Sequence, residues 1–103
     1  MSLTLTTGNA VFVSYCESIR IEKSKHNFSV RITNYDESIV YIFITDCIAD
    51  KHEEKTLTIS KVISGLTDGV NTFKVQWKVD GTTVYSDVES GVNSRNLSVV
   101  LLD

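Results

Sequence analysis

The sequence predicts an all-β domain built as an antiparallel β-sandwich of about eight strands. Three observations carry this prediction. Apolar and polar residues alternate with a period of two in several short segments, turn residues separate these segments about every 8–12 positions, and no long segment has the 3.6-residue period of a helix. The same spacing is typical of jelly rolls, so we expect jelly-roll topology in a single domain that covers residues 1–103.

Size and composition agree with one globular domain. The chain has 103 residues, of which 42% are hydrophobic and 22% are charged, and this is too apolar for a disordered chain. The longest apolar run, residues 39–44, is far shorter than the roughly 20 residues of a membrane helix, so we expect no membrane partner. The net charge is −3 and no basic block occurs, which argues against a nucleic-acid partner.

The strongest strand signal follows a turn, within residues 65–80. Phe73, Val75 and Trp77 alternate there with polar residues, so a period of two places the three side chains on one face. Read as a helix, the same segment would scatter them around its circumference. We therefore expect Phe73, Val75 and Trp77 to anchor the core.

The Asp-Gly pair at residues 80–81 is the strongest hairpin signal in the chain. A type I′ turn needs two positive φ angles, which Asp and Gly tolerate best. A two-residue loop would place Val79 opposite Thr82 and Trp77 opposite Val84. This register predicts that the segment after the turn returns along the same strand.

The first third of the chain contains four segments with the alternation of strands. They comprise residues 2–6, 10–16, 19–22 and 28–32. Polar residues separate the second from the third segment, and turn residues follow the fourth at residues 34–37. We therefore expect two closely spaced strands at the start, then a third and a fourth.

Residues 38–45 differ from the other strand segments because both faces are apolar. The aliphatic face suits the core, whereas Ile39, Tyr41 and Phe43 on the other face suit a subunit interface. The closing segment, residues 96–102, is also apolar on both sides. Because large exposed apolar patches are uncommon on monomers, we expect Ile39, Tyr41 and Phe43 to contact another subunit.

The most polar stretch, residues 46–55, is expected to be a solvated loop before a strand at residues 57–62. It includes His52, the second of two histidines in the sequence. Residues 91–95 form the last expected loop, and the chain closes in a strand.

No motif in the sequence marks a catalytic or cofactor site. Cys16, His26, Cys47 and His52 lack the short paired spacing of structural zinc sites. The glycine-rich phosphate-binding motifs and the nucleophile elbow are absent. Without a CxxC spacing, Cys16 and Cys47 fit either two buried free thiols or one disulfide. We expect no enzyme activity, no cofactor and no metal.

Residues 65–79 and 95–102 resemble segments of small jelly-roll domains in bacteriophage structural proteins. The matching features are a Gly-Leu turn, a second glycine, the strand TFKVQWKV and, after a loop, an arginine followed by a closing strand. Residues 8–14 are similar to the start of such domains. The hairpin at residues 80–81 departs from the Gly- and Ala-rich segment that the family has there.

This family is comparable to the heads of tumour necrosis factor and C1q and is often trimeric. The resemblance implies a non-enzymatic virion structural protein, a capsid decoration or cement protein that stabilises the capsid lattice as a homotrimer. Its partners would be further copies of itself and the major capsid protein or another virion protein. The alternative that the resemblance implies is a receptor- or carbohydrate-binding head at a tail fibre or tail tip.

Overall fold

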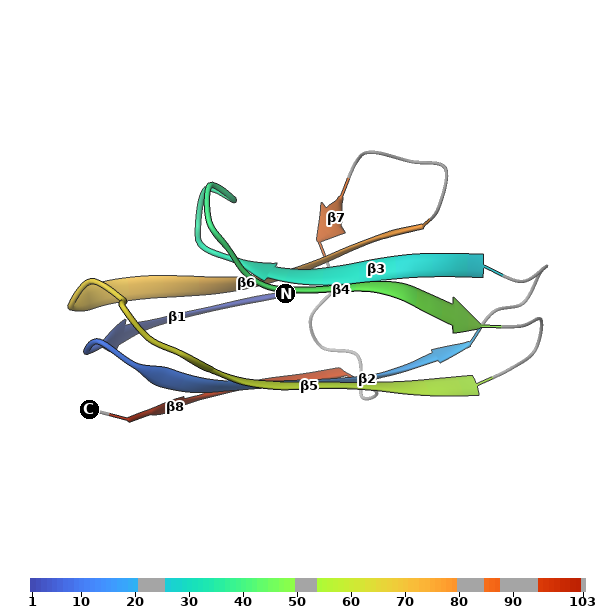
Figure 1. Cartoon of the computed structure of the whole chain (residues 1–103). Helices are drawn as coiled ribbons and strands as arrows, with labels where there is room; N and C mark the ends of the chain where they lie inside the picture. Colours follow the sequence, from blue (N-terminus) through green and yellow to red (C-terminus); the bar gives the residue numbers. More distant parts are fainter. Residues whose placement is uncertain (21–25, 50–53, 80–84, 88–94, 103) are drawn as a thin grey trace.

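The computed structural model describes residues 1–20, 26–49, 54–79, 85–87 and 95–102. These residues form seven extended strands and one two-residue strand, β7 (Figure 1). Their bounds are β1 (Ser2–Thr7), β2 (Val11–Arg20), β3 (His26–Thr33), β4 (Val40–Ala49), β5 (Glu54–Ile63), β6 (Gly69–Val79), β7 (Ser86–Asp87) and β8 (Arg95–Leu101).

The strands form two antiparallel sheets that lie over each other as two layers (Figure 1). The larger sheet has the order β1-β6-β3-β4, with β7 paired to β6, and the smaller sheet has the order β5-β2-β8. The prediction of an all-β fold made of two antiparallel sheets is confirmed. The pairings do not establish jelly-roll topology, because β1 pairs with β6 and β2 pairs with both β5 and β8.

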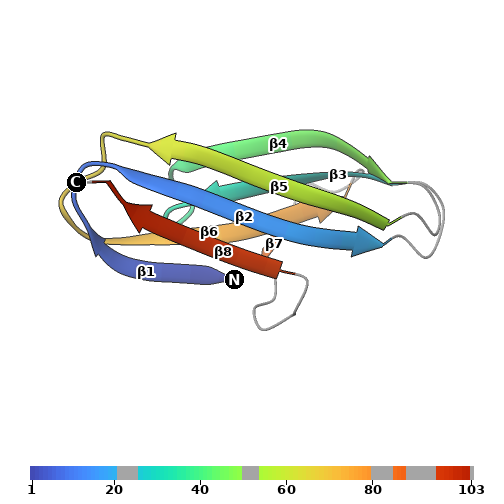
Figure 2. The same ribbon diagram turned by 90° about the horizontal axis from the view of Figure 1, so that it is seen from below.

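Strand β2 is the centre of the smaller sheet (Figure 2). Val11, Val13 and Tyr15 point into the core and are fully buried, as their alternation predicts. The strand continues without a break to Arg20, so residues 10–16 and 19–20 belong to one strand and not to two. Buried Glu17 lies at the point where polar residues were expected to separate two strands.

The polar stretch at residues 46–55 is largely strand. Residues 46–49 end β4, and residues 54–55 begin β5. Only residues 50–53 separate the two strands, and they lie outside the described residues. The expected loop is therefore wrong for residues 46–49 and 54–55, and it stays a prediction for residues 50–53.

The hairpin after β6 has a different register from the predicted one. Trp77 pairs with Ser86, whereas the predicted register placed Val84 opposite Trp77. The ladder is therefore shifted by two residues, and the expected turn lies outside the described residues. Strand β1 already occupies this edge of β6 up to Lys74, so β7 pairs only beyond that point.

The core lies between the two sheets and is made of aliphatic and aromatic side chains. Tyr15 and Phe73 are the largest fully buried side chains, and Val75 is also fully buried. Trp77, which we expected beside them, is 38% exposed and is not a core anchor. It lies near the end of β6, where β3 pairs on one edge and the two-residue β7 replaces β1 on the other.

Candidate binding surfaces

The described residues contain no cluster that could hold a metal. No group of three or more His, Cys, Asp or Glu side chains among them is close enough to bind an ion. Cys16 is a free, exposed thiol on β2. His52 and the side chains of His26 and Cys47 lie outside the described residues. In the same part of the chain, no helix is long and apolar enough to cross a bilayer.

The three residues expected at a subunit interface do not share one environment. Ile39 and Phe43 are each 52% exposed; Phe43 lies on β4, the edge strand of the larger sheet, and Ile39 immediately precedes this strand. Tyr41 instead packs on the core, with its ring centroid 5.5 Å from that of Phe73. The interface role of Ile39 and Phe43 stays a prediction, whereas Tyr41 does not lie on their exposed face.

A β-bulge explains the position of Tyr41. In the β3–β4 ladder Ile32 pairs with Ile42, but the next residue, Thr33, pairs with Val40. Tyr41 is therefore the extra residue of the bulge, and such a residue interrupts the alternation of faces. A pattern with a strict period of two cannot place it correctly.

From Phe12 to Ser18 on β2, and in the residues that pair with them, the outer face of the smaller sheet carries no charged side chain; the next pair in the same register is Arg20 and Glu54. The ladders align its residues in rows: Phe12 lies between Val62 and Val100, and Ser14 lies between Ser60 and Ser98. The remaining members are Cys16, Ser18, Thr56, Thr58 and Asn96. We call this surface the uncharged face.

The opposite outer face, on the larger sheet, carries charges that contact one another. Arg31 donates to Gln76 Oε1 at 2.9 Å and to Glu37 Oε1 at 3.1 Å. Lys74 Nζ lies 3.4 Å from Glu37 Oε2. The guanidinium of Arg31 also lies 3.8 Å from the ring centroid of Tyr85, at cation–π distance. We call this surface the charged face.

A buried polar cluster joins β2 to β8. The Tyr15 hydroxyl donates to Glu17 Oε2 at 2.8 Å, and Arg95 Nε donates to the same oxygen. Glu17 is buried, so these donors compensate its loss of hydration. Burial and the bond to Glu17 raise the pKa of Tyr15 well above its usual range, which keeps its hydroxyl protonated as a donor.

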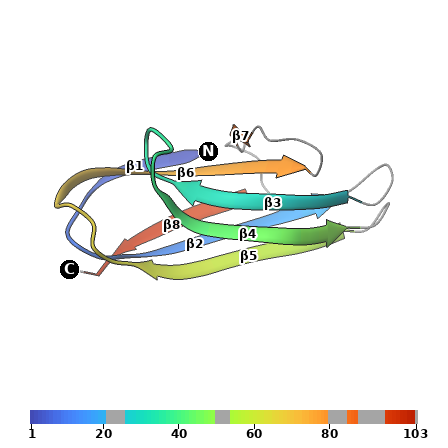
Figure 3. The ribbon, with the colours of Figure 1, turned by 45° about the horizontal axis from the view of Figure 1, so that its top comes forward.

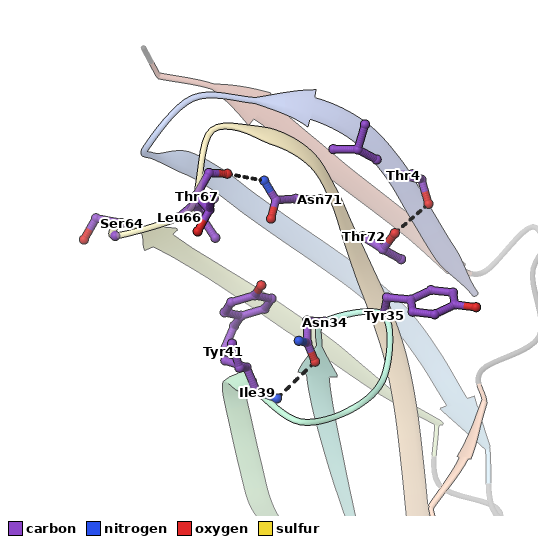
Figure 4. Close-up of a pocket in the computed structure, with 12 residues that line it drawn as sticks. Thr4, Asn34, Tyr35, Ile39, Tyr41, Ser64, Leu66, Thr67, Asn71 and Thr72 are labelled. Carbon is purple, nitrogen blue, oxygen red and sulfur yellow. Dashed lines mark hydrogen bonds between the residues drawn. The ribbon is translucent and has the colours of Figure 1, made fainter.

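A groove of about 710 Å³ opens at one end of the sandwich (Figure 4). The β3–β4 and β5–β6 loops lie at this end (Figure 3). Asn34 and Tyr35 come from the first loop, and Asn71 and Thr72 come from β6. Tyr41, on the bulge, also lines it. No Asp, Glu, Lys or Arg belongs to its lining, so the polar groups of the groove are all neutral.

The β3–β4 loop is fixed by its own hydrogen bonds. Asn34 Oδ1 accepts the N–H of Ile39 at 3.0 Å, and Asp36 Oδ1 accepts the hydroxyl of Ser38 at 2.6 Å. The bonds from Ser38 hold the pKa of Asp36 below its usual range. Glu37 has a φ of 64°, a left-handed conformation that is uncommon for a residue with a Cβ. The loop therefore presents a defined wall to the groove.

The β5–β6 loop forms the facing wall and is anchored at both ends. Gly65 and Gly69 have φ angles of 76° and 125°, which glycine adopts without steric cost. Between them Leu66 is buried, and its N–H donates to Asn9 O at 2.9 Å. The buried side chain and this backbone bond hold the loop against the β1–β2 connection.

Sequence reasoning did not find the groove because its residues come from distant parts of the chain. Asn34 and Tyr35 were recognised only as part of a turn, and Asn71 only as a strand residue. Ile39 and Tyr41 were assigned to an interface, yet both line the groove while Phe43 does not. The local signal that was available is the Asn-Tyr pair in the turn, which places an aromatic ring in solvent.

Comparisons with known proteins return no relative. No protein-family model matches the chain, and neither a curated protein nor a solved structure matches it. The resemblance to bacteriophage domains therefore stays a prediction, and the surfaces described above carry the functional argument.

Proposed function

We propose that this chain is a non-enzymatic virion structural protein that decorates a capsid lattice and docks through its uncharged face. The single observation that supports docking is the absence of charge on the outer side of β2 from Phe12 to Ser18 and in the residues of β5 and β8 that pair with this segment. The virion context comes from the sequence resemblance alone. The proposal needs the two-sheet sandwich and does not depend on the finer jelly-roll topology.

An uncharged outer face is unusual in a chain with 22% charged residues. Protein interfaces have cores that are depleted of charge, because a charge that loses its water must find a partner. The row formed by Val62, Phe12 and Val100 adds exposed apolar area at one end of the face. The neighbouring row of three serines has short side chains, so another protein surface can approach the backbone closely there.

Strand β8 strengthens the case for docking because it is an edge strand of the smaller sheet. Natural proteins protect such edges with Lys, Pro or bulges, which prevent unwanted pairing. Residues 96–102 contain neither a charge nor a proline. An edge of this kind suits a protein that completes its packing in an assembly.

The homotrimer is the second part of the proposal. Ile39 and Phe43 are apolar and half exposed, away from the uncharged face; Phe43 lies on the edge strand β4 and Ile39 immediately precedes this strand. Contact between subunits through this edge leaves the uncharged face free for the capsid. Tyr41 is not part of this contact, because it packs on Phe73.

The test is co-sedimentation with capsids made of the major capsid protein that the same genome encodes. Ser14→Arg places a charge in the middle row of the uncharged face, and we expect it to abolish co-sedimentation. Thr6→Arg is the matched control, because Thr6 is exposed on β1, outside that face, and should co-sediment like the unmodified protein. Equal binding of all three proteins, or of none, would contradict the proposal.

A second candidate function is a receptor- or carbohydrate-binding head. The groove between the β3–β4 and β5–β6 loops favours it, because an exposed aromatic ring and neutral polar groups meet there. This function needs neither a capsid nor the uncharged face.

A further inference from the structure

We propose that the groove at the β3–β4 end of the sandwich binds a neutral saccharide ring. This inference deepens the second candidate function and is independent of docking through the uncharged face. The polar groups of the groove are hydroxyls and side-chain amides, and its volume of about 710 Å³ lies in the range of small-ligand sites. The absence of a charged lining residue argues against a phosphate or carboxylate ligand.

Asn71 supplies a hydrogen-bond acceptor of fixed orientation. Its Nδ2 donates to Thr7 Oγ1 at 2.7 Å and to Thr67 O at 2.9 Å. The Thr7 hydroxyl donates its own hydrogen to Gly8 O, so it can only accept from Asn71. Both neighbours are therefore acceptors, which sets the amide with nitrogen towards them and Oδ1 towards the groove (Figure 4). A sugar hydroxyl can donate to this oxygen.

Tyr41 supplies a donor on the other side of the groove. Its ring is held by Phe73, and its hydroxyl makes no hydrogen bond to the described side chains that line the groove (Figure 4). Burial raises the pKa of Tyr41, so the hydroxyl stays protonated at neutral pH and keeps its hydrogen. Asn71 and Tyr41 together offer an acceptor and a donor, which is the pairing that adjacent sugar hydroxyls require.

Tyr35 supplies an apolar surface at one end of the groove. Its side chain is 79% exposed although the backbone of its loop is fixed, so the ring is available to a ligand. The hydroxyls of Thr4 and Thr72 lie beside this end and bond each other at 2.9 Å. A sugar presents C–H groups on one face of its ring and hydroxyls at its edge, so it matches an aromatic face next to hydroxyl and amide groups.

The test is an NMR titration of the isotope-labelled protein with methyl glucoside, methyl galactoside and N-acetylglucosamine in the millimolar range. We expect at least one of these sugars to shift the amide signals of the two groove loops. Tyr41→Phe removes only the hydroxyl and should weaken binding about two- to tenfold. Tyr35→Ala removes the exposed ring and should weaken it by a similar factor of about two to ten.

Phe43→Ala is the matched control, because it removes an exposed aromatic ring that does not line the groove, and it should bind like the unmodified protein. The inference is overturned if none of the sugars shifts the groove signals, or if binding survives unchanged in both Tyr41→Phe and Tyr35→Ala. It is also overturned if a short neutral peptide shifts these signals and the sugars do not. Capsid co-sedimentation is measured separately, so either proposal can fail alone.

Discussion

The two outer faces of the sandwich differ in the charged side chains that they carry. On the charged face Arg31, Glu37 and Lys74 form a connected network, with Tyr85 beside the guanidinium. On the uncharged face the rows around Phe12 and Ser14 offer only apolar and hydroxyl groups. Both sheets are antiparallel, and the difference between the two faces lies in their side chains.

This difference indicates which face stays in water. Charges that already pair with one another gain little from a protein partner, and removing their hydration is costly. Serine and valine on a flat sheet lose little on desolvation when a partner offers matching groups. One sandwich can therefore keep one outer face hydrated and use the other for assembly, provided that both sheets pack on the same core.

Phe73→Ala is expected to have the largest effect, because it tests that shared core. Phe73 is fully buried between the sheets, so its removal should lower the free energy of unfolding by about 3–5 kcal/mol. Trp77→Ala should cost clearly less, since Trp77 is partly exposed. Urea unfolding followed by circular dichroism measures both. Equal losses for the two variants would mean that Trp77 is a core residue after all.

Glu17→Ala is expected to have the next largest effect. Glu17 is buried on the core side of β2, behind the uncharged face. Glu17 accepts from Tyr15 and Arg95 and so ties β2 to β8. Its loss leaves Arg95 without this partner, and because Arg95 is partly exposed we expect a cost of about 2–3 kcal/mol.

The control for this variant is Tyr15→Phe, which removes one hydrogen bond and should cost about 1 kcal/mol. Urea unfolding compares the two proteins. A Glu17→Ala protein with the midpoint of the unmodified protein would show that the buried cluster does not hold β8 in place.

Glu37→Gln is expected to have the smallest effect and tests the charged face. A hydrogen bond from Gln76 and the charges of Lys74 and Arg31 hold the pKa of Glu37 below its usual range. A lowered pKa in the folded state stabilises the fold above the unfolded pKa of about 4.3, and this contribution is lost as the pH falls through the folded value.

We therefore expect the unmodified protein to be slightly more stable than Glu37→Gln at pH 7, with the difference disappearing as the pH falls below about 4. Thermal unfolding at several pH values measures it, and added salt should reduce it. A difference that grows towards acid pH would contradict the assigned direction of the pKa shift.

Alternation predicted the sheets because each strand is half buried, and this is visible in single residues. Val11, Val13, Tyr15, Phe73 and Val75 are fully buried, on the faces that a period of two gives them. The pattern failed at Glu17, which was expected to separate two strands although it lies inside β2. Its partner Arg95 lies 78 residues away, and no local pattern reveals such a contact.

The candidate sites were less predictable than the fold. The uncharged face can be recognised only when the register of three strands that are far apart in the sequence is known. The groove can be recognised only when two loops and a bulge are known to lie together. The bulge at Tyr41 is the clearest case, since one extra residue moved this side chain from the expected interface to the groove. Neither the strand register nor the bulge can be deduced from the spacing of residues in the sequence.

The most direct test of the docking account measures the reactivity of the Cys16 thiol, which lies on the uncharged face and is exposed. Cys47→Ser leaves it as the only thiol in the chain. We predict rapid maleimide labelling of the free protein and strong protection when capsids are bound. Lys78 belongs to the charged face, with its Nζ 5.1 Å from the ring centroid of Tyr85. A thiol at this position, from Lys78→Cys in a Cys16→Ser, Cys47→Ser background, should label equally in both states. Equal labelling of Cys16 in free and bound protein would contradict the account.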